Sequence, residues 1–313
     1  KITMLMRQVL DVYELLDRAD ASGALMEEYM RSLGAEDVEV TTIEGPKGTT
    51  DMIRITIPGT KGKTVGGDAP TLGVLGRLGG LGARPEQIGF VSDGDGALVA
   101  LAVAAKLLDM KSKGDDLEGD VVCCTHICPD APTSPHKPVP FMGSPVDMAT
   151  VNQHEVNGSL DAILSVDTTK GNRIINTRGF AISPTVKDGY ILRVSEDLLD
   201  VMQMTTGKLP HVFALSTQDI TPYGNELFHL NSILQPATAT NAPVVGVAIT
   251  TEVPVAGCAT GATHAADLEE AARFVLETAK AYGRGVCQFY NKEEFDKIVS
   301  KYGEMKHIQT LGK

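Results

Sequence analysis

The sequence predicts an α/β protein of three layers, with a mostly parallel or mixed sheet flanked by helices. Strand patterns and helix patterns alternate along the chain, and several strands are apolar throughout. One Ala/Leu/Val helix is apolar nearly all round, which is typical of a buried helix. No internal repeat or linker interrupts the pattern, so we expect one domain over residues 1–313.

The amino-terminal region predicts two helices followed by a hairpin. Apolar residues recur at helical spacing over residues 5–18, and a second helix is expected over Ala24–Leu33. Apolar and polar residues alternate over 38–42 and 53–57, and a Gly/Pro turn separates the two stretches. This pattern predicts two paired strands.

The rest of the chain continues the alternation after a Gly-rich stretch, residues 59–83, which is expected to form tight turns. We expect strands at 88–91, 121–125, 162–166, 211–216 and 244–249, and helices at 97–108, 196–204, 268–282 and 292–302.

Composition limits the partners. The formal net charge is -12, from 40 acidic against 28 basic residues, which disfavours nucleic acid and anionic membranes as partners. A small molecule, a short peptide or a metal ion is the expected partner. The five cysteines have no framework spacing, and neither a membrane-spanning run nor a basic leader is visible. We therefore expect a cytoplasmic location.

Polar residues follow several predicted strands. Asp93, His126 and Asp167 each stand just after an apolar stretch, and His264 lies near the start of a long helix. Ligands gather at the carboxyl ends of strands in open α/β sheets. Carboxylates and histidines meeting there would suit a divalent metal, which can polarise a carbonyl group and activate a water molecule.

The order of these residues resembles the co-catalytic di-zinc aminopeptidases. Segments 93–97, 163–167 and 261–264 are similar to their bridging-aspartate, aspartate-ligand and histidine-ligand segments. The resemblance implies the aminopeptidase fold and one or two divalent ions, with zinc expected, held by Asp93, Asp167 and His264. It also suggests a homo-oligomer, because related aminopeptidases commonly assemble.

The sequence departs from that family at two motifs. The Glu-Glu pair expected after the strand at 121–125 is replaced by Thr125-His126, so no general base is evident. The His-x-Asp metal motif is absent, and only Asp68 stands where it is expected. His126 and Asp68 are therefore further candidate ligands. Segments 76–85 and 135–142 also resemble an uncharacterised bacterial family of unknown function, which supplies no reaction.

A second cluster lies in a Pro-rich loop. His126, Cys128 and His136 are either metal ligands or a cysteine nucleophile with a histidine base. The spacing matches no zinc-ribbon pattern.

Residues 59–64, Gly-Thr-Lys-Gly-Lys-Thr, resemble the phosphate loop of Mur-type ATP-dependent ligases. A phosphate loop requires a helix that opens at Lys63-Thr64, and the glycines and proline that follow would break it. ATP binding stays a minor alternative.

The leading hypothesis is a metal-dependent hydrolase that cleaves an amide bond in a short peptide or amino-acid derivative. The alternative is a non-catalytic, metallopeptidase-like protein that binds a small ligand. The missing Glu pair favours binding, and the retained Asp, Asp and His order favours hydrolysis. The minor alternative is an ATP-dependent ligase that uses residues 59–64.

Overall fold

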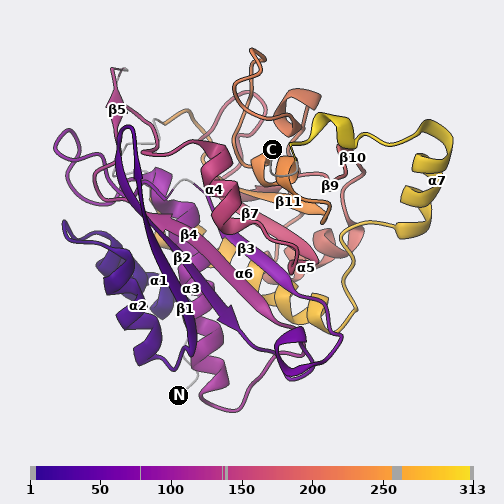
Figure 1. The fold of residues 1–313 in the computed structure, drawn as a ribbon, viewed down its shortest axis with the longest axis horizontal. Coiled ribbons are helices and arrows are strands. Elements are labelled where there is room, and N and C mark those ends of the chain that lie inside the picture. Colours follow the sequence, from indigo (N-terminus) through magenta and orange to yellow (C-terminus); the bar gives the residue numbers. More distant parts are fainter. Residues whose placement is uncertain (1–4, 78, 136, 138–139, 256–262, 311–313) are drawn as a thin grey trace.

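The structure is a computed structural model that describes residues 5–77, 79–135, 137, 140–255 and 263–310. A mixed sheet runs through it, with helices on both faces (Figure 1). The helices are α1 (Leu5–Leu16), α2 (Gly23–Ser32), α3 (Asp95–Lys111), α4 (Met148–Glu155), α5 (Glu196–Thr206), α6 (Ala265–Gly283) and α7 (Lys292–Tyr302). Within these ranges, no helix combines the length and apolar character needed to cross a membrane.

The main sheet has nine strands in the order β1-β2-β4-β3-β7-β11-β9-β10, with β8 also paired to β11. Its strands are β1 (Asp37–Gly45), β2 (Gly48–Ile57), β3 (Leu72–Gly76), β4 (Val121–Ile127), β7 (Ala162–Thr168), β8 (Gly179–Ile182), β9 (Val186–Lys187), β10 (Tyr190–Ile191) and β11 (Val244–Thr250). A small separate sheet pairs β5 (Thr133–Ser134) with β6 (Phe141–Met142).

Four central strands, β4, β3, β7 and β11, run parallel, and the outer strands β2, β8 and β9 are antiparallel to their neighbours. The carboxyl ends of the four parallel strands therefore meet at one edge, the top of the sheet in Figure 1. The loops that follow them gather there.

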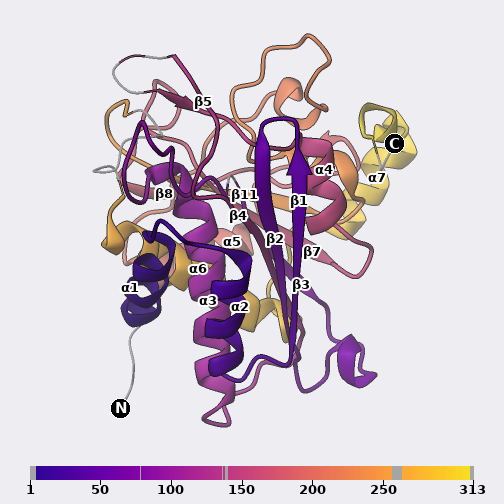
Figure 2. The same ribbon diagram turned by 60° about the vertical axis from the view of Figure 1, so that its left-hand side comes forward.

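Helices cover the two faces unequally. Helices α1, α2, α3 and α6 lie on one side of the sheet and α4 on the other (Figure 2). Side chains alternate along each strand, so Val74 and Leu164 pack with the α3 core while Leu75 and Ile163 pack in the opposite core. The predicted α/β class with a mixed sheet between helical layers is confirmed.

Helix α3 packs closely against the sheet because its first turn contains glycine. A Cβ atom on Gly96 would lie 2.4 Å from the carbonyl oxygen of Val166 in β7. The Ala/Val/Leu sequence that follows is buried over almost its whole length, as the sequence predicts. This contact fixes the start of α3 at the carboxyl edge.

Two predicted strands are wrong. Residues 88–91 and 211–216 form no strand, and the central strand β3 instead lies inside the Gly-rich stretch. Its Gly73 allows close packing, because a Cβ atom there would lie 2.8 Å from Leu160 Cδ1. Gly73 and Gly76, which suggested turns, are thus packing residues of a buried strand. Phe90 is buried in a loop, where its N–H donates to Asp17 at 2.6 Å.

Candidate active site

The carboxyl edge of the sheet brings three aspartates together. Asp167 lies near the end of β7, Asp93 lies in the 3-10 turn η2 (Ser92–Gly94), and Asp95 begins α3. The hydroxyl of Thr168 donates to the carbonyl oxygen of Ser92 at 2.7 Å, which ties this turn to the end of β7. Asp95 and Asp167 are buried, and Asp93 is partly exposed.

Asp95 is held by two groups from distant parts of the chain. The Lys170 Nζ atom lies 3.3 Å from one carboxylate oxygen, and Thr263 Oγ1 donates to the other at 2.8 Å. Burial raises the pKa of Asp95 to about 6, although Lys170 and the Thr263 hydroxyl both oppose this rise. The result is a buried ion pair beneath the edge.

Asp167 is satisfied by neutral donors. Ser232 Oγ donates to one oxygen at 2.9 Å, and the N–H of Thr168 donates to the other at 2.7 Å. Burial raises the pKa of Asp167 to about 6, and these hydrogen bonds oppose the rise.

Asp93 differs from both. Its carboxylate has no hydrogen bond or ion pair within the described part of the chain. Burial, followed by repulsion from Asp167 and Asp95, raises its pKa to about 7, and Lys170 opposes this rise. A carboxyl group that titrates near neutral pH and has no fixed partner can accept and return a proton. Asp93 is therefore the candidate general base.

A buried cation lies beneath this cluster, on the side of the sheet covered by α4. Arg77 directly follows β3, and its Nε atom lies 2.8 Å from Glu155 Oε2. The same guanidinium donates to Asn152 Oδ1 at 2.6 Å. Arg77 opposes the rise in the pKa of Asp167, so its guanidinium stabilises the ionised form of that carboxyl group.

His126 does not lie free at the site. The N–H of Gly79 donates to its Nε2 at 3.1 Å, and its Nδ1 lies 2.9 Å from Thr50 Oγ1. Burial and then Arg77 lower the pKa of His126 to about 4, so the ring is neutral at neutral pH. Both nitrogens are engaged, and this histidine holds the loop after β3 against β4.

Asp68 and His264 differ in their relation to the aspartates. Asp68 is exposed and precedes Leu72, the first residue of β3, so it lies near the amino edge of the sheet. His264 is the residue before α6, with Nδ1 3.5 Å from Asp267 Oδ2 and its side chain 47% exposed. Of the five predicted ligands, Asp93 and Asp167 lie in the aspartate cluster, and His264 directly follows Thr263, whose hydroxyl donates to Asp95.

The predicted zinc ligands are thus brought together only in part. No group of three or more His, Cys, Asp or Glu side chains in the described ranges is placed to hold a metal ion. The three aspartates offer only oxygen donors, which suit Mg²⁺ or Mn²⁺ better than zinc. The buried Lys170 ammonium already lies against Asp95.

The Pro-rich loop does not support a cysteine nucleophile. Cys128 is buried, and burial raises the pKa of its thiol to about 11, so the thiolate is scarce at neutral pH. Its backbone pairs with the loop after β3, since its N–H donates to Gly79 at 3.0 Å. His136 lies outside the described residues.

Comparison with protein families gives a match over residues 41–312 to the family described as "Protein of unknown function (DUF1177)". The chain belongs to the DUF1177 family. The expectation of an uncharacterised family is confirmed. No curated protein matches the sequence of this DUF1177 member.

One similar solved structure is the bottromycin maturation enzyme BotP. It aligns with a TM-score of 0.53 and 17% sequence identity, over 89% of this chain and 70% of that chain. This likeness shows a shared fold.

The loop over residues 59–64 does not form a phosphate cradle in this DUF1177 member. The N–H groups of Gly59 and Thr64 donate to the carboxylate of Asp120 at 2.8 and 2.9 Å. Only the 3-10 turn η1 (Lys63–Val65) follows, in place of a helix. The amides that would bind phosphate are thus used by Asp120, which argues against the ligase hypothesis.

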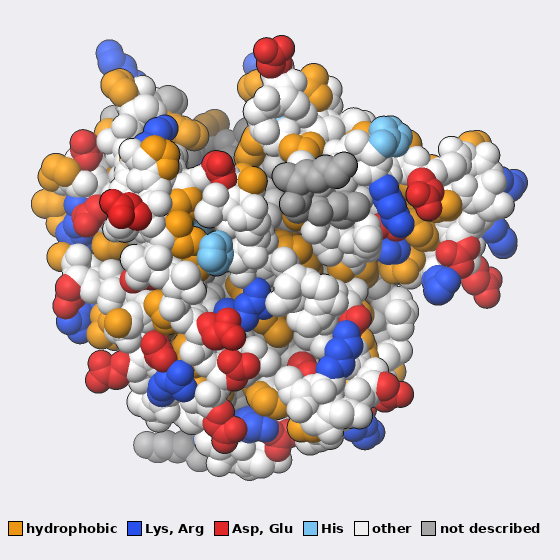
Figure 3. Space-filling model, viewed as in Figure 1, with side chains coloured by type: hydrophobic (Ala, Val, Ile, Leu, Met, Phe, Trp, Pro, Cys, Tyr) orange, Lys and Arg blue, Asp and Glu red, His pale blue; other side chains and the backbone are white. Residues whose placement is uncertain are grey.

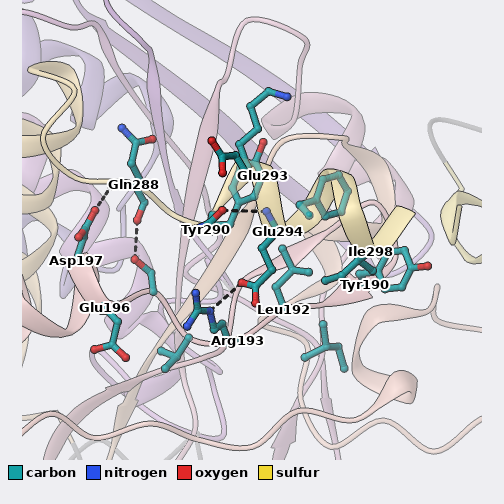
Figure 4. A pocket seen from close by; sticks show the side chains of 16 residues that line it. Tyr190, Leu192, Arg193, Glu196, Asp197, Gln288, Tyr290, Glu293, Glu294 and Ile298 are labelled. Carbon is teal, nitrogen blue, oxygen red and sulfur yellow. Dashed lines mark hydrogen bonds and ion pairs between the residues drawn. The ribbon is translucent and has the colours of Figure 1, made fainter. Parts of the chain in front are cut away.

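Two pockets differ in their relation to the aspartates. One of about 360 Å³ includes Thr169 and Asn231, which are close in sequence to Asp167 and its partner Ser232. The surface is notched at the carboxyl edge, at the top of Figure 3. Another pocket of about 640 Å³ lies between β10, α5 and α7 (Figure 4). Its Gln288 lies past the far end of α6, a 19-residue helix about 28 Å long, so this pocket is remote from the aspartates.

Sequence reasoning missed Lys170, Arg77, Ser232 and Thr263. Lys170 lies two residues past β7, and a search for cations as well as carboxylates after each strand would have found it. Arg77 was hidden because β3 itself was not predicted. Ser232 and Thr263 come from loops whose approach to the aspartates has no local signal.

Proposed function

We propose that this protein is a hydrolase that cleaves an amide bond in a short peptide or amino-acid derivative. The observation that carries the proposal is Asp93, an unpaired carboxyl group with a raised pKa beside the Asp95–Lys170 ion pair. A base that titrates near neutral pH, placed at the carboxyl edge of parallel strands, suits activation of water.

The reaction follows from the charges at this edge. Ionised Asp93 accepts a proton from a water molecule, whose oxygen bonds to the carbonyl carbon of the amide. Negative charge develops on the carbonyl oxygen, where the Lys170 ammonium would stabilise it. Protonated Asp93 then gives its proton to the departing nitrogen as the C–N bond breaks. Each of these steps uses only groups of the chain.

The remaining residues position this pair. Asp95 pairs with the Lys170 ammonium, and Thr263 donates to the other carboxylate oxygen of Asp95, so both residues help to hold this ion pair in place. Asp167 contributes to the raised pKa of Asp93 through repulsion. The shared fold with BotP, a maturation enzyme, is compatible with peptide chemistry and adds support of a general kind.

The test is hydrolysis of a panel of dipeptides and N-acyl amino acids by the wild type, Asp93→Asn and Lys170→Met. We expect Asp93→Asn to reduce kcat/KM by about 10² to 10⁴, the usual contribution of a general base. The wild-type rate should rise with pH through about 7, because Asp93 acts when ionised. Asp68→Asn, a change at the other edge of the sheet, is the matched control and should keep full activity.

Two results would count against the hydrolase. One is an Asp93→Asn variant that retains wild-type activity and its pH profile. The other is a folded wild type that cleaves no member of the panel, with or without added divalent metal. In the second case, direct binding of the same compounds would favour the small-ligand binding protein.

A further inference from the structure

The pocket of about 360 Å³ is lined by residues close in sequence to Asp167 and Ser232, and its walls are of two kinds. Thr169 lies two residues after Asp167, and Asn231 directly precedes Ser232, whose hydroxyl donates to Asp167. A ligand in this pocket would therefore extend toward the reacting groups. Small-molecule pockets span about 300–1,000 Å³, so this pocket is at the small end of the range and suits a small ligand group.

One part of the lining is apolar and comes from three connecting segments. It is formed by Ile174, Ile175, Ala214 and Leu230. Ile174 is 50% exposed and Leu230 is 47% exposed, so both present apolar surface to solvent. A ligand side chain that covered this surface would gain hydrophobic free energy.

Arg173 gives the pocket a charged wall. The Arg173 side chain is exposed and has no hydrogen bond or ion pair within the described residues. Arg193, by contrast, is paired with Glu294 at 2.9 Å. An unpaired guanidinium on a pocket wall is suited to bind a carboxylate through two parallel hydrogen bonds.

Asn231 adds an unused acceptor. Its side-chain oxygen is buried and has no hydrogen-bond partner in the described part of the chain. A buried acceptor without a donor costs free energy, which an N–H group of a ligand would recover after a small rotation of the side chain.

Both walls are held in place before any ligand binds. Asn172 Oδ1 accepts from the N–H groups of Ile174 and Ile175 at 2.7 and 2.9 Å. Buried Asp219 accepts from the N–H groups of Leu230 and Asn231 at 3.0 and 3.3 Å. Asp219 thus positions this wall through the backbone.

We infer that this pocket binds the carboxyl-terminal residue of a dipeptide-like substrate, with Arg173 on its free carboxylate and Ile174 and Leu230 on an apolar side chain. This inference rests on the proposed hydrolase function. The amide nitrogen of the bound substrate then lies near Asn231, and its carbonyl carbon is directed toward Asp93 and Lys170. Water adds to that carbon, the C–N bond breaks, and the nitrogen takes one proton. The departing product is a free apolar amino acid held in this pocket.

The test measures binding of product-like probes that cannot be hydrolysed. Titrations followed by NMR would compare L-leucine, L-leucinamide and glycine with the wild type, Arg173→Gln and Leu230→Ala. We expect leucine to bind about tenfold more tightly than leucinamide, as a hydrogen bond to a charged group implies. In Arg173→Gln the affinities for leucine and leucinamide should differ by about twofold or less, because the charged contact is lost. Arg193→Gln, an exposed arginine in the remote pocket, is the matched control.

The apolar wall has its own readout. Leucine should bind about tenfold more tightly than glycine to the wild type, and Leu230→Ala should reduce that preference. Equal binding of leucine and leucinamide by the wild type would overturn the inference, even if the enzyme cleaves other amides. A preference for leucine over leucinamide that persists in Arg173→Gln would overturn it as well. Selective leucine binding without cleavage of any peptide would retain the pocket and reject the hydrolase.

Discussion

Four carboxyl groups in and beneath the site share one electrostatic condition. Burial raises the pKa values of Asp93, Asp95, Asp167 and Glu155, while Lys170 and Arg77 oppose the rise. Each of these side chains therefore costs free energy when it ionises in the folded protein. The cations Lys170 and Arg77 offset part of that cost.

This condition predicts how stability depends on pH. For Asp95, the folded pKa of about 6 exceeds its ordinary 3.8, so the folded state binds more protons between these values. Its contribution to the free energy of unfolding is highest below pH about 4 and falls as the pH rises through about 6. Denaturant unfolding of the wild type and Asp95→Asn between pH about 3 and about 7 tests this. The free energy of unfolding of the wild type should fall relative to that of Asp95→Asn as the pH rises.

Asp147 supplies the opposite control. Its pKa is lowered from 3.8, first by the backbone N–H of Thr150, so its contribution is present above that pH and is lost as the pH falls. The difference between wild type and Asp147→Ala should therefore grow with pH. If the stability difference between wild type and variant had the same slope against pH for Asp95→Asn as for Asp147→Ala, the raised pKa of Asp95 would be contradicted.

At the scale of elements, the position of the site depends on how closely α3 approaches β7. Gly96 allows this contact, and Asp93 and Asp95 stand just before it. The glycine serves as a spacer of minimal size between a helix and a strand. Its backbone is helical, so its importance is steric.

Gly96→Ala should therefore destabilise the protein although alanine is the better helix former. A Cβ atom 2.4 Å from Val166 O forces the helix to shift, at a cost of about 1–3 kcal/mol for such overpacking. Urea unfolding measures this loss, and Gly158→Ala, which meets nothing within 4 Å, is the control. A Gly96→Ala protein as stable as the wild type would show that α3 can move freely.

The elements show what sequence patterns could and could not predict. The hairpin, α3, β4, β7, β11 and α6 were predictable because each has a continuous periodic pattern. Strand β3 was not, because Gly73 and Gly76 were selected by neighbours distant in sequence and look locally like turn residues. Asp93 and Asp167 could be predicted as strand-end residues. Lys170 and Arg77 could not be assigned roles, since burial and ion pairing across the chain define them.

At the scale of the whole molecule, the sheet separates two edges with different chemistry. Asp93 and Asp167 lie at the carboxyl edge, whereas Asp68 lies near the amino edge. Strand β4 has seven residues, so about 20 Å separates the two edges. A metal ion cannot be shared across that distance.

Binding of a metal ion should depend on Asp93 at the carboxyl edge and not on Asp68 near the amino edge. After dialysis against zinc or manganese, any ion retained by the wild type should be lost in Asp93→Ala and kept in Asp68→Ala. Metal content measured by mass spectrometry, with protein concentration determined in parallel, gives the comparison. Loss of the ion in Asp68→Ala would contradict the placement of Asp68 outside the site.

At the amino edge, the carboxylate of Asp120 accepts hydrogen bonds from the loop over residues 59–64. Where a phosphate loop takes its anion from solution, this corner carries its own, covalently attached through the chain. The loop is therefore closed by hydrogen bonds within the chain, and the N–H groups of Gly59 and Thr64 are not offered to an external anion.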